Sequence, residues 1–246
     1  MATVTFRFYE ELNDFLPSSR RKTAFCYACA PGETVKHAIE ALGVPHTEVE
    51  LILVDGESVG FDRILTEGDR IAVYPVFEVF DVAPLLRLRE SPLRVTRFVA
   101  DAHLGALAAK LRMAGFDTLY DNHFDDDEIE ALAVAERRIV LSRDRELLKR
   151  RAITHGCYVH AQKPAEQLRE IFTRLDLFAS ARPFSLCMAC NAPLREIAKG
   201  DIETRVPSDV FAGHARFVTC DVCRRVYWEG SHWRRMRALL DELASR

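Results

Sequence analysis

Arg-Phe-Val-Ala-Asp at residues 97–101 and Ile-Val-Leu-Ser-Arg-Asp at residues 139–144 are the two stretches that decide the fold of this chain. Each is a short apolar run that ends in or just before a carboxylate, which is typical of a buried strand in a parallel sheet. In an open α/β sheet, ligands bind in the crevice outside the carboxyl ends of the strands. Asp101 and Asp144 are therefore expected to approach one crevice although they are distant in sequence.

A run of acids at residues 125–128, Asp-Asp-Asp-Glu, lies between these strands and opens an amphipathic helix. Carboxylates gathered from all three places would repel one another unless a cation neutralised them, so the pattern indicates a divalent metal site. Each acid also has a structural interpretation. Asp101 and Asp144 can cap the helices that follow them, and the Asp-x-x-Glu run matches a capping box.

Helices and strands alternate along the whole region around these acids, which predicts a parallel sheet with helices on both faces. The expected strands are 97–100, 117–120, 138–142 and 157–160, and the expected helices are 103–114, 126–136, 145–150 and 164–173.

The first 80 residues follow a different order, strand-strand-helix-strand-strand. Alternating apolar residues at 4–8 predict a half-buried strand. Thr34 is expected to cap a helix that runs to Leu42. The other expected strands are 23–28, 51–54 and 71–76, which gives one sheet packed on one helix. Two prolines and no periodicity at 81–94 predict a linker.

These patterns together predict an α/β protein of three domains. The expected boundaries are 1–82, 95–178 and 183–246, with the last domain built around metal-binding cysteines.

Four cysteines form two Cys-x-x-Cys knuckles late in the chain, at Cys187 with Cys190 and at Cys220 with Cys223. The 29 residues between the knuckles exceed the usual spacing of roughly 15–20. Two knuckles can close a tetrahedral four-thiolate site, so we expect one structural Zn²⁺. His214 and His232 lie nearby but are expected to be surface or RNA-contacting groups, because the cysteines already satisfy the metal.

The remaining cysteines are expected to be structural. Cys26 and Cys29 form a third Cys-x-x-Cys, but in a strand residues three apart point to opposite faces. Cys157 lies in an apolar strand and is expected to be a packed core thiol. Near the end of the chain, Trp228 is expected to pack, whereas Trp233 is a candidate either for packing or for stacking on unpaired bases.

Composition excludes some classes of function. The chain has 246 residues, of which 48% are hydrophobic and 29% charged, as in ordinary globular proteins. It shows neither an apolar run near the roughly 20 residues of a membrane span nor a secretory signal, so we expect a cytoplasmic protein without membrane contact. Residues 1–84 contain 7 basic and 14 acidic residues, whereas the remaining residues contain 27 basic and 23 acidic ones. Any nucleic-acid contact is therefore expected in the later part.

The stretch "RFVADAHLGALAAKLRMAGFDTLYDN" and the late motif "D126xxI129xxLA133…RRIVLSRD144REL", together with the cysteine region, closely resemble the mutator-type (Mut-seven C-terminal) RNase family, a PIN-like domain. The resemblance spans residues 97–240. It implies that Asp101, Asp126 and Asp144 are the metal-holding and catalytic carboxylates of a ribonuclease. It also implies Mg²⁺ or Mn²⁺ as the catalytic ion and RNA as the partner.

The chain departs from the PIN pattern at two points: Ser142 stands where threonine is commoner, and helix 103–114 lacks the additional acid that this pattern usually supplies. Asp121, Asp125 or Asp127 would have to replace it. Arg143 and Arg145 flank Asp144 and are candidate RNA-binding residues, with solvated surface charges as the alternative. The missing acid supports a second interpretation, a catalytically weak RNA-binding or adaptor protein that keeps the fold and the zinc.

The segment "VDGESVGFDRILTEGDRIAVYPVF" resembles the hairpin, turn and last strand of the ThiS/MoaD-like branch of the ubiquitin fold, over about the first 80 residues. Sulfur carriers of that branch end in Gly-Gly. Here Phe-Glu-Val-Phe at 77–80 continues into the next region, so the resemblance implies a binding or positioning role, with a possible protein partner.

Overall fold

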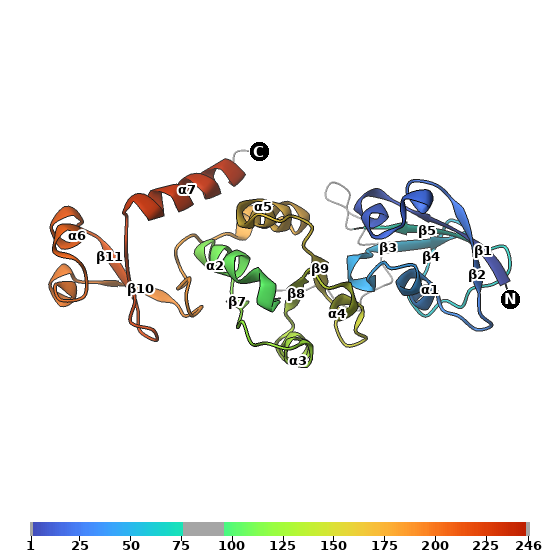
Figure 1. Ribbon diagram of the computed structural model, residues 1–246, viewed down its shortest axis with the longest axis horizontal. Helices are drawn as coiled ribbons and strands as arrows, with labels where there is room; N and C mark the ends of the chain where they lie inside the picture. Colours follow the sequence, from blue (N-terminus) through green and yellow to red (C-terminus); the bar gives the residue numbers. More distant parts are fainter. Residues whose placement is uncertain (1, 76–95, 245–246) are drawn as a thin grey trace. The chain divides into compact units, whose positions relative to one another are not determined.

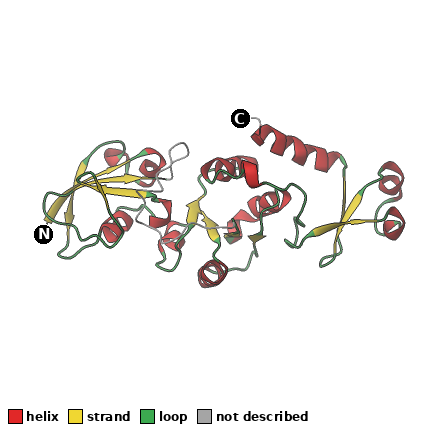
Figure 2. Cartoon of the chain, turned by 180° about the vertical axis from the view of Figure 1, so that it is seen from behind, coloured by secondary structure: helices red, strands yellow, loops and turns green. Residues whose placement is uncertain are grey.

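The computed structural model describes residues 2–75 and 96–244 (Figures 1 and 2). The chain divides into two compact units. Unit 1 consists of residues 1–95 and 126–158, and unit 2 consists of residues 96–125 and 159–246. The linker expected at 81–94 lies outside the described residues.

The N-terminal part of unit 1 is a five-stranded sheet with one α-helix, the β-grasp arrangement of the ubiquitin fold. Its strands are β1 (Ala2–Phe8), β2 (Phe25–Cys29), β3 (Leu51–Val54), β4 (Glu57–Ser58) and β5 (Arg70–Tyr74), and its helix is α1 (Val35–Ala41). The strand order is β2-β1-β5-β3-β4, in which β1 and β5 are parallel and the other pairs antiparallel. Within residues 2–75 it also contains the 3₁₀ turns η1 (Glu10–Phe15), η2 (Ser18–Arg20) and η3 (His46–Glu48).

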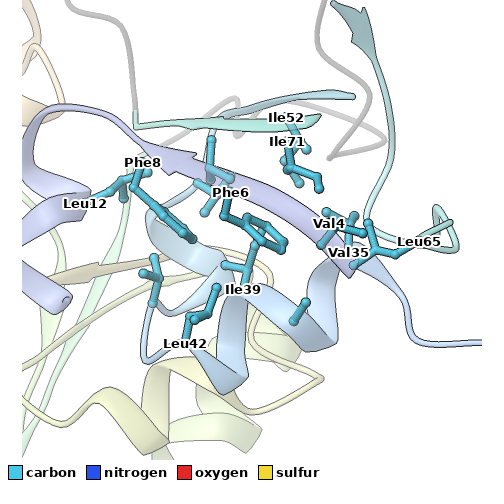
Figure 3. Close-up of a cluster of buried hydrophobic side chains, with 14 of the residues drawn as sticks. Val4, Phe6, Phe8, Leu12, Val35, Ile39, Leu42, Ile52, Leu65 and Ile71 are labelled. Atoms are coloured by element: carbon cyan, nitrogen blue, oxygen red, sulfur yellow. The ribbon is translucent and has the colours of Figure 1, made fainter. Parts of the chain in front are cut away.

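The core of this domain follows from the alternation at the start of the chain. Val4, Phe6 and Phe8 are each at most 1% exposed, and they lie on the side of the sheet covered by α1, where Ile39 is also buried (Figure 3). Burying such a side chain contributes about 1.5–3 kcal/mol, so this face fixes which side of the sheet the helix covers.

Two local features of this domain follow from its sequence, and the expected cap at Thr34 is confirmed. The side chain of Thr34 accepts a hydrogen bond from the backbone N–H of His37 and caps α1. Asp55 and Gly56 both have positive φ, at 51° and 88°, in the tight turn between β3 and β4. Asp-Gly suits such a hairpin turn because glycine adopts positive φ without strain.

The later part of unit 1 comprises α3 (Asp126–Glu136), β8 (Ile139–Ser142), α4 (Arg145–Lys149) and β9 (Gly156–Tyr158). β8 and β9 pair in parallel, as the alternation of helix and strand predicts. All four residues of β8 are buried, which explains why the first three are apolar.

Unit 2 begins with β6 (Phe98–Ala100), the 3₁₀ turn η5 (Ala102–Leu104), α2 (Gly105–Met113) and β7 (Thr118–Leu119), with β6 and β7 parallel. It continues with α5 (Pro164–Arg174), which packs against α2, and the turn η6 (Phe178–Ser180). The mixed α/β fold class with parallel strand pairs is confirmed.

The C-terminal part of unit 2 is a three-stranded antiparallel sheet of β10 (Leu194–Ile197), β11 (Phe217–Cys220) and β12 (Val226–Trp228). The turn η7 (Lys199–Ile202) and the short helix α6 (Ser208–Gly213) connect β10 to β11, and α7 (Ser231–Ala244) follows the sheet. Among the described residues, no helix combines the length and apolar character required to cross a bilayer.

Candidate functional site

Asp144 follows β8 directly and is the N-cap of α4. Its Oδ1 accepts a hydrogen bond of 2.8 Å from the backbone N–H of Glu146, and its own N–H donates to Ser142 Oγ at 2.8 Å. Ser142 is fully buried, whereas Asp144 is exposed. The capping interpretation is confirmed, and the cap holds an exposed carboxylate in a defined orientation at the carboxyl end of a strand.

Asp126 is the first residue of α3, and Arg150 interacts with it and with two neighbouring acids. An Arg150 Nη atom lies 3.4 Å from Asp126 Oδ2, and the same guanidinium contacts Asp127 at 2.5 Å and Glu130 at 3.0 Å. Hydrogen bonds to Asp127 and then Glu130 raise the pKa of Arg150. The side chain of Asp126 is 48% exposed, so its ion pair is solvent-screened and easily exchanged for another cation.

Asp101 lies in unit 2, between β6 and η5. Its carbonyl oxygen accepts a hydrogen bond of 2.8 Å from the backbone N–H of Leu104, but its side chain makes no capping hydrogen bond. The half-buried carboxylate of Asp101 is therefore not used as a side-chain helix cap. The convergence of Asp101, Asp126 and Asp144 on one ion remains a prediction.

Arg145 packs against the N-terminal domain of unit 1. Its guanidinium carbon lies 4.9 Å from the ring centre of Phe15 and 5.7 Å from that of Tyr158, and Nη1 donates to the Phe15 carbonyl at 3.2 Å. These are the distances of cation–π contacts. Arg143 on the other side of Asp144 is half-buried. RNA binding by these two arginines remains a prediction.

Cys187, Cys190, Cys220 and Cys223 come together in unit 2, with their sulfur atoms all within 4.8 Å of one another. Sγ–Sγ distances are 3.5 Å for the pair Cys187–Cys223 and 3.3 Å for the pair Cys190–Cys220. A tetrahedral zinc site with Zn–S bonds of about 2.3 Å has sulfur–sulfur edges of about 3.8 Å. The donor set therefore fits a closed four-thiolate site and contains no histidine.

The thiols of this cluster differ strongly in acidity. Burial raises the pKa of Cys190 to about 12. Burial also tends to raise the pKa of Cys187, but hydrogen bonds from the Tyr227 hydroxyl and from backbone N–H groups outweigh it and lower this pKa to about 6. Four adjacent thiolates require a neutralising cation, which is the charge that a bound metal supplies.

Arg112 of α2 anchors the first knuckle to the rest of unit 2. It is only 5% exposed; its Nε donates to the Thr118 carbonyl at 2.8 Å, and Nη1 donates to the carbonyls of Met188 and Ala189 at 3.2 and 3.0 Å. Burial lowers the pKa of Arg112, while the neighbouring cysteines act in the opposite direction. The guanidinium thus fixes the backbone between two of the cysteines.

Asn191 provides a second anchor immediately after the first knuckle. Its Oδ1 accepts the backbone N–H of Thr118 at 3.0 Å, and its Nδ2 donates to Asp117 Oδ1 at 2.6 Å. The residue has a φ of 67°, which asparagine tolerates better than most side chains. The candidate metal cluster is therefore attached to α2 and β7.

An open groove of about 720 Å³ lies beside the three-stranded sheet of unit 2. Trp228 and Trp233 both line it, and the Trp233 ring stacks on Phe184 with 5.1 Å between centroids. Trp233 therefore packs on one face within unit 2. The stacking of an unpaired base on these aromatics stays a prediction.

The other cysteines behave as expected. Cys26 is exposed and Cys29 is fully buried, so this third Cys-x-x-Cys places its thiols on opposite faces of β2. Cys157 is 1% exposed in β9 and is a packed core thiol. The interpretation of both as structural residues agrees with these positions.

Sequence reasoning missed Arg112, Arg150 and Phe15. Arginines give no local signal of burial or pairing, and two of the carbonyl groups that Arg112 binds lie more than 70 residues away along the chain. Phe15 is 130 residues from Arg145. An arginine within the expected apolar helix 103–114 was the one available hint.

A β-grasp domain, parallel α/β segments and a four-cysteine ribbon define the chain as a modular α/β protein with a candidate structural metal centre. The chain belongs to the Mut7-C RNAse domain family, whose sequence model matches residues 96–240. Residues 1–81 match the model of the Mut7-C ubiquitin domain. Both resemblances seen in the sequence are confirmed. Family membership supports a nuclease-type enzyme.

Two solved structures of small archaeal modifier protein 1 from Haloferax volcanii are similar to part of the chain. One is 17% identical, with 31% of this chain and 100% of that protein covered and a TM-score of 0.26. The other is 16% identical, with 31% and 97% covered and a TM-score of 0.25. These scores are too low to support an argument about function. Among curated proteins, none matches the chain.

Proposed function

We propose that the protein is a metal-dependent ribonuclease that hydrolyses RNA phosphodiester bonds. Asp101, Asp126 and Asp144 are the carboxylates that would hold Mg²⁺ or Mn²⁺. The observation that carries the proposal is Asp144, whose exposed carboxylate is fixed at the carboxyl end of β8 by its own helix cap and by buried Ser142. Family membership of residues 96–240 supports the same conclusion.

The donor chemistry at Asp126 and Asp144 suits a hard divalent ion, because both offer carboxylate oxygens that solvent reaches. When bound, such an ion lowers the pKa of a water molecule and offsets the negative charge that develops on the phosphate. Arg150 offsets part of the negative charge of the acids at the start of α3, where Asp126 would hold the ion. Arg143, beside Asp144, is the proposed contact to RNA phosphates.

We propose Zn²⁺ as the ion of the four-cysteine cluster, because four thiolates on two knuckles leave no open coordination position. Its role is structural. The proposed partner of the protein is RNA. The N-terminal domain is proposed to act within the same chain.

The second candidate function is an RNA-binding or adaptor protein without effective chemistry. The specific observation in its favour is Arg150, which already pairs with Asp126, Asp127 and Glu130. Titration with Mn²⁺ separates the two candidates. An enzyme with converging carboxylates is stabilised by millimolar Mn²⁺, whereas an adaptor without them is not.

Asp144→Asn provides the direct test of the enzyme. It keeps the size of the side chain and an oxygen for the cap, but removes the charge that holds the ion. We expect a loss of Mn²⁺-dependent RNA cleavage by about 100-fold or more. Glu146→Gln is the matched control, since the side chain of Glu146 is 80% exposed and pairs with Lys149. Equal cleavage by wild type, Asp144→Asn and Glu146→Gln would show that the activity belongs to a contaminant.

A further inference from the structure

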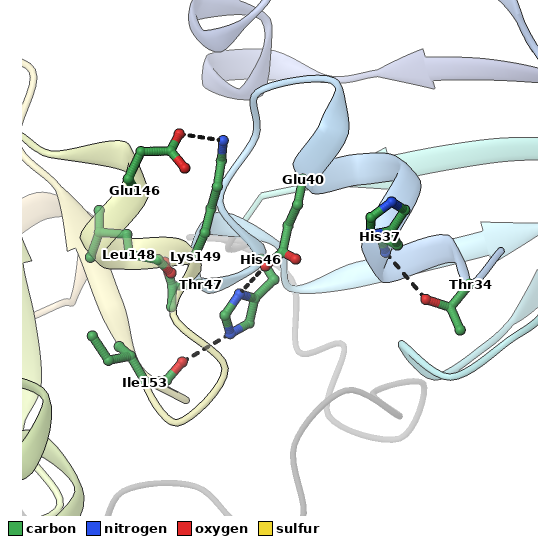
Figure 4. A network of polar contacts seen from close by, with 9 residues as sticks. All are labelled: Thr34, His37, Glu40, His46, Thr47, Glu146, Leu148, Lys149 and Ile153. Atoms are coloured by element: carbon green, nitrogen blue, oxygen red, sulfur yellow. Dashed lines mark hydrogen bonds and ion pairs between the residues drawn. The ribbon is translucent and has the colours of Figure 1, made fainter. Parts of the chain in front are cut away.

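The N-terminal domain contacts the segment that carries Asp144 through a set of side chains that we call the docking surface. These residues are Phe15, His46, Thr47 and Glu48, from η1 and η3. They meet α4, β9 and the loop between them within unit 1, at Arg145, Leu148, Ile153 and Tyr158. Figure 4 shows the part of this surface around His46 and Thr47.

An aromatic contact forms one part of the surface. Phe15, which is 4% exposed, meets Tyr158 edge to face with 5.2 Å between ring centroids. Arg145 lies within cation–π distance of both rings and also donates to the Phe15 carbonyl. One arginine therefore joins both segments through its charge, its planar surface and a hydrogen bond.

Buried polar groups form the other part. His46, Thr47 and Glu48 are 4%, 2% and 1% exposed, which is unusual for three consecutive polar residues. His46 Nε2 lies 2.9 Å from the Ile153 carbonyl, and Thr47 Oγ1 donates to the Leu148 carbonyl at 3.4 Å (Figure 4).

Two further contacts belong to this polar part. Glu48 Oε1 accepts the backbone N–H of Tyr158 at 2.5 Å, and His46 Nδ1 lies 2.7 Å from Glu40 of α1. Because buried polar groups cost free energy without partners, these residues suit a surface that stays covered.

The docking surface reaches the candidate catalytic carboxylate through consecutive residues. Arg145 is the first residue of α4, and Asp144 is the N-cap of the same helix. Leu147 and Leu148 are fully buried, so the five-residue helix is held along its length. Movement of Arg145 must therefore move the cap on which Asp144 sits.

We propose that the ubiquitin-like domain acts in cis as a positioning element of the ribonuclease segment, and that Arg145 is the positioning residue that links it to Asp144. This inference rests on the proposed function. It replaces RNA contact as the role of Arg145, because the guanidinium is already engaged by Phe15 and Tyr158. It also assigns an intramolecular use to a domain that lacks the Gly-Gly of the sulfur carriers at residues 77–80.

Hydrogen–deuterium exchange and RNA-cleavage kinetics on the full chain test the proposal. Arg145→Met keeps the aliphatic stem but removes the charge and the donor. We expect amide exchange in residues 145–158 to rise about tenfold. We expect kcat to fall on the order of tenfold with KM unchanged, since a displaced carboxylate impairs catalysis rather than binding. Loss of an RNA contact would instead raise KM and weaken the salt dependence.

Thr47→Val removes one contact of the docking surface without altering the segment that carries Asp144, and it serves if Arg145→Met does not fold. We expect it to raise exchange in residues 145–158 as well. Arg151→Met is the control, because Arg151 is an exposed arginine in the same segment. Exchange that stays at the wild-type rate in both Arg145→Met and Thr47→Val would overturn the proposal, as would a raised KM with unchanged kcat in Arg145→Met.

Failure of the positioning role and failure of the ribonuclease assignment give different results. If the wild-type chain cleaves no RNA, the ribonuclease assignment fails. The exchange rates then still decide whether the N-terminal domain holds the turn at Asp144.

Discussion

Arg112 shows how one residue of α2 can determine the geometry of a metal cluster far along the chain. Its guanidinium donates to three carbonyl groups, two of which lie between Cys187 and Cys190. A planar group with several donors in fixed directions suits this task, whereas a lysine would reach only as a single point charge. The residue therefore shapes the knuckle through its backbone carbonyl groups.

Arg112→Met is expected to lower the free energy of unfolding by about 3 kcal/mol, because it leaves buried carbonyl groups without a donor. Urea denaturation followed by tryptophan fluorescence measures this change, since Trp228 and Trp233 both lie in unit 2. The exposed Arg216 is the control, and Arg216→Met is expected to change stability by less than about 0.5 kcal/mol. Identical denaturation midpoints for the two variants would refute the structural role of Arg112.

At the level of elements, the sequence was informative where local chemistry decides the structure. Helix 126–136 was predicted with the bounds that α3 has, because acids open it and apolar residues follow with helical spacing. The expected helix 103–114 is instead divided into η5 and α2. A Cβ atom at Gly105 would lie 2.5 Å from the Tyr120 ring, so this glycine permits a close approach that periodicity does not reveal.

The cap of α1 offers a test at this scale. Thr34→Ala removes the oxygen that accepts the His37 N–H, and we expect a loss of about 1 kcal/mol in unfolding free energy. Thr34→Ser keeps the oxygen and is expected to retain most of the stability. Thermal unfolding of both variants, followed by circular dichroism, provides the measurement. A Thr34→Ser variant as unstable as Thr34→Ala would mean that the methyl group, not the cap, matters.

At the scale of the whole molecule, sequence patterns identified the family and the two knuckles but not the long-range pairings. The cluster could be predicted from the sequence because four of the cysteines have the spacing of two metal-binding knuckles. The pairing of Arg150 with the acids of α3 and the docking of Phe15 on Arg145 depend on how distant segments fold together. Ordinary surface residues such as arginine take part in them, and no local motif marks these contacts.

Zinc removal tests how far the cysteine cluster stabilises the protein. Structural zinc contributes on the order of 10–16 kcal/mol in small zinc-binding peptides, so we expect a strong chelator to unfold residues around the cluster while the β-grasp sheet of unit 1 persists. Hydrogen–deuterium exchange by region, together with elemental analysis showing one zinc per chain, measures the effect.

Cys190→Ser is expected to lose the metal, because it removes one of four ligands. Cys26→Ser is the matched control, since Cys26 is an exposed cysteine of the other Cys-x-x-Cys and lies outside the cluster. If Cys190→Ser retained a full equivalent of zinc, or if Cys26→Ser lost it, the ion would have to be held elsewhere, and the knuckles would owe their shape to Arg112 and Asn191 alone.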